Sequence, residues 1–598
     1  MTIDTVDLLK HVGETTGFTG IEINVSVAEF FEVVSELKGR EILFENCDFN
    51  FVNGESNIDT YLEKKITFNG CTFKNAVVWE RLFFASQYTL NPQNTAFVFA
   101  NCVFDNTICF NEIDSRYDKK INFINCKLQH VYFENLKSGN SKFSICFSKC
   151  KAQSIVISEI DKLLLCVTDS MEIGKLAIVS ISEKIEICTS FSKIRELAIE
   201  SIGGVVAIDT DINTQYLKII DCQKITKPLS INIDCECELI NSTFEAEFGF
   251  WEGIGQEKGA PIVARDCIFN DTVNFSTFGM NRSHITIEDS TFRKKLWIGH
   301  SSIDKLVFRN CNFEDTVKIF HFADQAICNL KNQIKYADFS MSTIKSLFLF
   351  NDGGDKRLCL ERETTIDFSN IFIEPSGYLI IRNVNDDKNY NGNFKFCCAN
   401  ILGNVVFSDV YANSLDLEHS SIVGNFNVEK TEFNDYVNSQ TLVKLKNEAI
   451  KKNDTIKALE YKGEEMVKYR GELRKKGIFK NLKERFLITL NTCSNNNGQS
   501  WTRGLVFTLG LAVFFCLLLD FGAESRIYCT WNGWDSCKII FERFLAVINI
   551  FHFETDSESA SEALKLNIGG NYIFFLSKIV VGYGIYQTIA AFRKYGKQ

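Results

Sequence analysis

A phrase of eight residues recurs along this chain and limits the folds open to it. The phrase reads ILFENCDF from Ile42, ITFNGCTF from Ile66, FVFANCVF from Phe97 and INFINCKL from Ile121, and later copies begin at Ile262, Ile285 and Leu306. Within each group, successive copies stand 21 to 31 residues apart. A period of a little over twenty residues, with insertions, is typical of a solenoid.

Alternation within each copy predicts a strand with one inward face. The first and third residues, the Cys or Ser, and the final Phe share that face. A strand this short cannot bury such a face alone, whereas stacked coils give each inward side chain an identical neighbour above and below. The chain has 53 Phe and 22 Cys but only 4 Pro, and proline would remove donors from the strand ladder. We therefore expect a parallel β-solenoid over residues 41–438.

The corners of the expected coils carry small and turn-forming residues. Cys or Ser fits where the chain bends, and we expect the neighbouring Asn or Asp to bond its own backbone. The steps Ile42-Leu43-Phe44 and Cys47-Asp48-Phe49, five residues apart, resemble the pentapeptide-repeat family, whose unit has a small residue, then Asp or Asn, then Leu or Phe. The resemblance covers roughly residues 40–435 and implies a right-handed parallel β-helix.

The N-terminal 40 residues are expected to cap the solenoid. Ser26 and Glu29 fit a capping box, and helical spacing follows, so we expect a helix over 27–38. The first residues are acidic where an export signal would be basic. Because 18 of the 22 cysteines lie between Cys47 and Cys398, in a segment expected to stay reduced, we interpret them as buried thiols. No zinc-type spacing is present, so we expect no metal and no cofactor.

Residues 439–500 change to a helical pattern. Spacing of three and four predicts a largely apolar stripe formed by Leu442, Leu445, Ala449, Lys452, Ile456, Leu459, Gly463, Met466, Arg470 and Leu473. The stripe fits a coiled coil, or a single amphipathic helix that caps the solenoid. Apolar and basic residues then interleave from Phe479 to Leu490, which is typical of a helix lying on a membrane surface.

Residues 501–598 predict a membrane domain with two spans, at about 502–521 and 572–592. A helix at about 538–553 has only ten uncharged residues in a row, so we interpret it as re-entrant or interfacial. Residues 439–503 hold 15 Lys or Arg against 7 Asp or Glu, and three basic residues follow the last span. Both termini are therefore expected in the cytoplasm, in a multi-pass protein of a bacterial inner membrane. The net charge of −10 leaves −18 for residues 1–438.

The last expected span contains VGYG from Val581, which matches the core of a potassium-channel filter. Only 14 residues follow Gly584, too few for the further span that such a filter needs, so we interpret the match as chance. Small residues on one side predict close helix packing instead. The candidate packing or pore-lining residues are Ser577, Lys578, Gly582, Gly584, Thr588 and Ala591. Lys578 either snorkels to the interface or faces an aqueous lumen, and the two glycines could let the helix bend.

The topology of two spans around a re-entrant helix resembles a two-span ion channel. In an oligomer, carboxylates after that helix would form rings that favour cations, and the candidate pore mouth is His552, Glu554, Asp556 and Glu558. An ordinary solvated acidic loop is the alternative. Cys529 and Cys537 in the same outer segment could form a disulfide.

These observations favour a homo-oligomeric membrane protein whose cytoplasmic solenoid binds an unknown protein or ligand and whose two spans form a cation-permeable pore. The alternative is a scaffold in which the spans only anchor the solenoid. Some pentapeptide-repeat proteins mimic DNA, and the acidic charge is compatible with that, but it disfavours direct binding of nucleic acid. No phosphate loop, HExxH motif or nucleophile elbow is present, so we expect no enzyme activity.

Overall fold

The computed structural model divides the chain into two compact units. One comprises Met1–Asn413 with Val423–Asn434, and the other comprises Ser414–Ile422 with Asp435–Gln598. The residues that the structure describes are 2–3, 17–37, 39, 41–52, 60–62, 64–84, 95–115, 118–137, 142–168, 171–189, 193–208, 214–232, 235–251, 260–275, 281–300, 302–321, 334–351, 357–358, 360, 363–385, 391–475, 482–523, 533–551 and 564–592.

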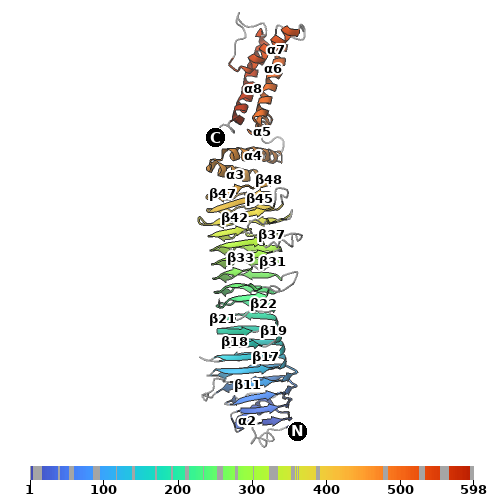
Figure 1. The fold of residues 1–598 in the computed structure, drawn as a ribbon, viewed down its shortest axis with the longest axis vertical. Helices are drawn as coiled ribbons and strands as arrows, with labels where there is room; N and C mark the ends of the chain where they lie inside the picture. The colour runs from blue at the N-terminus through green and yellow to red at the C-terminus, as the bar shows by residue number, and fades with distance from the viewer. Residues whose placement is uncertain are drawn as a thin grey trace. The chain divides into compact units, whose positions relative to one another are not determined.

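The first unit is a β-solenoid in which all strands are parallel, so the predicted fold class is confirmed (Figure 1). In much of it each coil supplies three short strands, and each strand pairs with the equivalent strand of the next coil. One coil holds β25 (Glu236–Ile240), β26 (Thr243–Phe244) and β27 (Phe248–Trp251), which pair with β28 (Ile262–Arg265), β29 (Ile268–Phe269) and β30 (Val273–Asn274). The inward faces of successive coils therefore form one continuous core.

Inward aromatic rings form columns along the solenoid. One column consists of Phe18, Phe44, Phe68, Phe99, Phe123 and Phe147, whose neighbouring ring centroids lie 4.9 to 5.4 Å apart with interplanar angles of at most 14°. Parallel strands repeat at about 4.8 Å, so in-register phenylalanines must stack nearly face to face with an offset. All six rings are almost completely buried. The phenylalanine content thus follows from the ladder geometry.

The residue before each inward Cys or Ser commonly adopts a left-handed backbone conformation. Its φ lies between 45° and 66° at Asn46, Gly70, Asn101, Asn125, Lys149, Asp221, Asn241, Asp266, Asp289 and Asn310. Asn, Asp and Gly tolerate this region best, which explains their frequency there. Their amides bond between coils: Asn125 Nδ2 donates to Asn101 Oδ1 over 2.7 Å. These side chains thus form a ladder between coils, and bonds to the local backbone of the expected kind occur at other corners, where Asp367 Oδ1 accepts from the Ser369 amide over 2.8 Å.

Inward thiols lie in the corners next to these residues. Cys71 Sγ donates to the Phe44 carbonyl oxygen over 3.4 Å, and Cys102 Sγ donates to that of Phe68 over 3.4 Å. Cys47, Cys71 and Cys102 are free and almost completely buried. Each thiol therefore fills a small corner volume and bonds to the preceding coil.

Helix α2 (Val27–Glu36) lies at the start of the solenoid. Ser26 and Glu29 form a capping box, in which Ser26 Oγ accepts from the Glu29 amide over 3.2 Å. Lys64 Nζ donates to the carbonyl oxygens of Val34 and Ser35 at the other end of the helix, over 3.0 and 2.8 Å. Both ends of α2 are thus satisfied by side chains.

The strand ladder begins before this helix. Strands β2 (Gly17–Thr19) and β3 (Glu22–Ile23) pair with β4 (Glu41–Glu45) and β5 (Asp48–Phe49). Paired coils are therefore present upstream of the expected solenoid boundary at residue 41. The helix is an insertion between two coils of the ladder.

In the second unit, the predicted amphipathic segment forms two helices, α3 (Ser439–Lys451) and α4 (Thr455–Lys475). Asn453 breaks the stripe with a φ of 60°, and Asp454 Oδ1 accepts from the Lys457 amide over 2.9 Å to begin α4. Leu442 and Leu445 are buried on α3, whereas Ile456 is 44% exposed. The stripe is thus divided between two helices instead of continuing through one.

Candidate functional site

Further helices follow among the described residues of the second unit. They are α5 (Leu482–Asn495), α6 (Trp501–Leu519), α7 (Gly533–Ile548) and α8 (Ile568–Phe592), and a short 3-10 helix η2 (Asp520–Gly522) extends α6. The segments Trp501–Gly522 and Ile568–Phe592 are long and apolar enough to cross a membrane. The predicted site residues that the structure describes lie on these helices. We therefore treat this helical group as the candidate functional site.

Helices α6 and α8 pack closely along their length through small residues. A Cβ atom added to Gly584 would lie 2.7 Å from Thr508 Oγ1, and one added to Gly504 would lie 3.1 Å from Thr588 Cα. The hydroxyls of Thr508 and Thr588 are 3.2 Å apart. At the other end of the pair, a Cβ atom on Gly522 would lie 2.5 Å from Gly570 Cα. The two helices are therefore antiparallel neighbours whose contact requires glycine.

The VGYG stretch lies inside α8, in helical conformation. Gly584 is buried against α6, whereas the nearest atom to a Cβ on Gly582 would be Ile550 Cγ2, at 3.7 Å. Tyr583 donates its hydroxyl to Asn491 Oδ1 on α5 over 2.7 Å. An extended loop lined by carbonyl groups is absent at these four described residues, so they do not form a filter here.

The small residues of α8 are buried to different degrees. Ser577 and Ala591 are fully buried, and Thr588 is half-buried. Ser577 Oγ donates to the Phe574 carbonyl oxygen within the same helix over 2.6 Å. The predicted small residues thus lie mainly toward the interior of the helical group.

A polar network joins α5 to the C-terminal half of α8. Asn495 Nδ2 donates to the backbone and side-chain oxygens of Gln587 over 3.0 and 2.6 Å. Gln587 Nε2 in turn donates to Asn491 Oδ1 over 3.1 Å. Because Asn495 and Gln587 are buried, these bonds satisfy polar groups that would be costly to leave unpaired.

A buried ion pair joins α7 to the end of α6. Arg543 Nη1 lies 2.7 Å from Asp520 Oδ1, and the Arg543 side chain has no exposed surface. Removal of either partner would take a counter-charge away from a buried charge, so this contact helps to fix the position of α7. The sequence does not predict this pair, because Arg543 stands there only as the charge before ten uncharged residues.

Lys578 lies at the carboxyl end of α7. Its Nζ donates to the carbonyl oxygen of Ala546, and to that of Asn549 over 2.7 Å, and it lies 4.2 Å from the centre of the Phe574 ring. The final carbonyls of a helix lack intrahelical donors and carry partial negative charge. Lys578 is only 6% exposed, so in this structure it neither snorkels to a surface nor faces a lumen. It caps a neighbouring helix.

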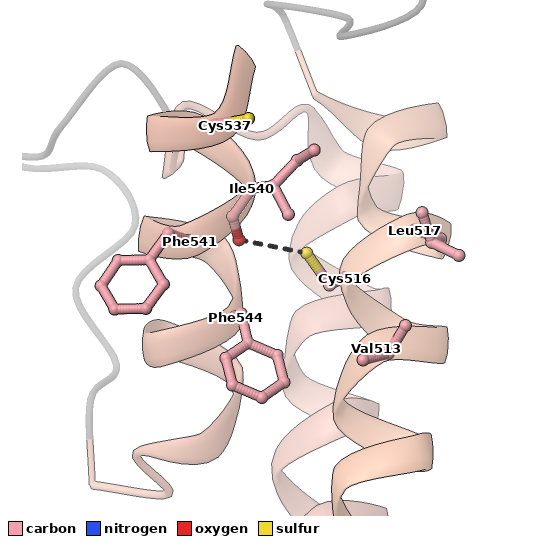
Figure 2. A pocket seen from close by; sticks show the side chains of 7 residues that line it. All are labelled: Val513, Cys516, Leu517, Cys537, Ile540, Phe541 and Phe544. Carbon is pink, nitrogen blue, oxygen red and sulfur yellow. Dashed lines mark hydrogen bonds between the residues drawn. The ribbon is translucent and has the colours of Figure 1, made fainter. Parts of the chain in front are cut away.

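An apolar groove lies between α6 and α7 and has a volume of about 260 Å³ (Figure 2). Its lining consists of Val513, Cys516 and Leu517 from α6 and Cys537, Ile540, Phe541 and Phe544 from α7. Cys516 Sγ donates to the Ile540 carbonyl oxygen over 3.5 Å at its base. The groove offers almost no polar surface, so it could hold only an apolar group.

Much of the apolar surface of the two candidate spans is exposed. Only 39% of the residues in an apolar 18-residue window of Trp501–Gly522, and 33% of those in such a window of Ile568–Phe592, are buried within the chain. The most exposed apolar side chains on these helices include Val506, Phe514, Leu517, Phe575, Ile579 and Tyr586. A core helix of a soluble protein would be covered on most sides, whereas these faces leave large apolar side chains exposed, as expected of surfaces that contact lipid or another protein.

The predicted pore mouth, His552, Glu554, Asp556 and Glu558, lies outside the described residues, as does Cys529. Cys537 is exposed on α7. Helix α7 ends at Ile548, before the end of the predicted 538–553 segment, and begins earlier, at Gly533. Among the described residues, no group of three or more His, Cys, Asp or Glu side chains is placed to hold a metal ion.

No family model, curated protein or solved structure matches this chain. Function must therefore be argued from the two units themselves.

Proposed function

We propose that this chain is an integral membrane protein of a bacterial inner membrane, in which a cytoplasmic β-solenoid controls an oligomeric cation-permeable pore. The exposed apolar faces of α6 and α8 carry this proposal, since fewer than half of the residues in each candidate span are buried within a single chain. Lipid can cover one part of that surface, and neighbouring copies can cover another.

Two helices cannot enclose a channel, so conduction requires several copies around a common axis. Helix α7 is anchored to both spans, by Arg543 to Asp520 and by Lys578 in α8. The acidic run at Glu554 and Asp556 follows α7 directly in the sequence. Symmetric copies would turn that run into rings of carboxylates, which attract cations and repel anions.

The charge distribution supports the proposed orientation. The basic residues of 439–503 precede the first span, and Arg593, Lys594 and Lys597 follow the second. Because α6 and α8 are antiparallel, both basic segments belong on one side of the membrane. The solenoid precedes the first basic segment and is proposed to share the cytoplasmic side.

Single-channel recording of the purified full chain in planar bilayers tests the pore. We expect cation-selective conductance, and we expect a triple variant with Glu554→Gln, Asp556→Asn and Glu558→Gln to lose most of the selectivity. Asp535→Asn is the matched control, because this exposed acid lies at the opposite end of α7. Absence of conductance under every ligand and voltage, from protein shown to be oligomeric, would refute the pore.

A membrane-tethered scaffold is the second candidate, because the solenoid unit alone accounts for most of the chain. In a scaffold the spans serve only as an anchor. Replacing residues 500–598 with an unrelated two-span anchor separates the two proposals. A scaffold should keep its cellular activity after the replacement, whereas a pore protein should lose it.

A further inference from the structure

Helix α5 is held by its neighbours on two sides. On one side, Asn491 Oδ1 accepts from the Tyr583 hydroxyl and the Gln587 amide of α8, over 2.7 and 3.1 Å. On another side, Arg485 Nη2 donates to the Leu473 carbonyl oxygen of α4. These contacts determine which side of α5 stays open.

The open side of α5 carries large apolar side chains. Leu482, Phe486 and Leu487 are 56%, 67% and 57% exposed. Helical spacing places Leu482, Phe486 and the exposed Cys493 along one line, with Leu487 beside it. We call these four residues the α5 stripe. Exposed apolar patches mark surfaces that bind a protein or a membrane, so the stripe needs an occupant.

The contacts of α5 place the stripe where both candidate spans end. Asn495, the last residue of α5, bonds to Gln587 in the last two turns of α8. Helix α6 begins shortly after α5, at Trp501, whose ring centroid lies 4.8 Å from that of Phe592, the last residue of α8. Tryptophan is enriched at the headgroup level of membranes. The α5 stripe therefore lies near the boundary between lipid and water.

Basic side chains border the α5 stripe. Lys483 lies within α5, Arg474 in the last turn of α4 and Arg503 in the first turn of α6, and all three are exposed. The neighbouring acid Glu484 accepts from the Tyr469 hydroxyl over 3.1 Å. An apolar face bordered by positive charge is complementary to a leaflet that contains anionic lipid.

We propose that the α5 stripe and Lys483 bind anionic phospholipid of the cytoplasmic leaflet. The apolar side chains enter the boundary of the acyl chains, and Lys483 and Arg503 contact headgroup phosphates. Because Asn491 and Asn495 connect α5 to α8, the lipid composition then acts on the second span. This inference rests on the membrane insertion proposed above, but it does not require conduction through a pore.

Thiol alkylation of the full chain in vesicles tests the inference, because Cys493 is a native reporter within the α5 stripe. N-ethylmaleimide reaches both sides of a vesicle, and site-resolved mass spectrometry gives the rate at Cys493 relative to the exposed Cys398 of the solenoid unit. We expect this relative rate to be about fivefold lower in phosphatidylcholine vesicles with phosphatidylglycerol than in phosphatidylcholine alone. Lys483→Gln should remove most of the difference.

Lys452→Gln is the matched control. This exposed lysine follows α3, the helix that contacts the Ser414–Ile422 coil segment, and its replacement should keep the lipid effect. Phe486→Ser is a second variant, which should raise the rate at Cys493 in the anionic vesicles, and circular dichroism shows whether it keeps its helices.

Equal relative rates at Cys493 in the two kinds of vesicle would overturn the inference. Slow alkylation in both would indicate that a second copy of the chain covers the α5 stripe, which would overturn it as well. Alkaline washing of the same vesicles tests insertion separately. Release of the chain would refute the proposed membrane function together with this inference, whereas retention with equal rates would refute only the binding of anionic lipid.

Discussion

At the scale of single residues, Lys578 connects α8 to the end of α7. Lys578→Met keeps the apolar stem but removes the donors to the Ala546 and Asn549 carbonyl groups. Hydrogen bonds from a charged donor contribute about 1.5–3 kcal/mol, so we expect the free energy of unfolding to fall by about that amount. Thermal unfolding in detergent measures the loss, and Lys578→Arg should lose less because it keeps the charge.

Alkylation of Cys516 gives a second readout for Lys578. This thiol is buried behind α7 and bonds to the Ile540 carbonyl oxygen. If α7 loosens in Lys578→Met, site-resolved mass spectrometry should record faster alkylation at Cys516. An unchanged rate together with unchanged stability would show that the lysine does not hold α7.

The buried Asp520–Arg543 pair should respond differently to a single substitution and to replacement of both residues. Arg543→Met should destabilise the helical unit by about 3–5 kcal/mol, because Asp520 would lose the Arg543 counter-charge while it stays buried. The double variant Asp520→Leu with Arg543→Met should be more stable than Arg543→Met alone, since both charges of the pair are then replaced by apolar side chains. A double-mutant cycle of unfolding midpoints in detergent checks the order. If the losses of stability from Asp520→Leu and Arg543→Met add up in the double variant, the two residues do not stabilise each other.

Repetition determines which of these residues could be predicted. Inward Ile, Phe and Cys positions were predictable, because every coil repeats the same environment at the same spacing. The partners of Arg543 and Lys578 were not, since Asp520 is 23 positions from Arg543, and Asn549 is 29 positions from Lys578. Those contacts depend on how three helices meet, which local spacing does not encode.

At the scale of elements, the contact of α6 with α8 depends on missing side chains. Gly584→Leu places a branched side chain where even a Cβ atom would lie 3.3 Å from Thr508 Cα. We expect the helices to separate and the unfolding midpoint in detergent to fall, with a cost of about 1–3 kcal/mol typical of overpacking. Gly510→Leu on α6 is the matched control, because a Cβ atom there would meet nothing within 4 Å. Equal losses in both variants would contradict this contact.

Helix boundaries show what the sequence leaves open at this scale. The stripe from Leu442 to Leu473 keeps helical spacing, yet the chain turns at Asn453. Asn453 tolerates a positive φ, and Asp454 after it is a residue that can cap a helix. This turn signal could have predicted that the stripe divides between two helices. The start of α7 at Gly533 is less predictable, since Trp534 and Asp535 lie outside the apolar run.

At the scale of the whole molecule, the two units differ in what stabilises them. In the solenoid each coil contacts its neighbours, so stability is approximately a sum of local terms and an open end is vulnerable. In the helical unit, the contacts of α6 with α8 join residues about 80 positions apart. We therefore expect the helical unit to unfold cooperatively and the solenoid to respond mainly to damage at its ends.

The coil segment Ser414–Ile422 is contacted by α3 within the second unit. The Leu417 amide donates to Thr441 Oγ1 over 2.9 Å, and Lys444 donates to the Leu417 carbonyl oxygen. A fragment that ends at residue 434 loses both partners and exposes unpaired backbone groups, so it should aggregate. A fragment that ends at residue 452 keeps α3 and should remain monomeric. Size-exclusion chromatography with light scattering compares the two fragments. A monomeric shorter fragment would show that α3 is not needed to cover the Ser414–Ile422 segment.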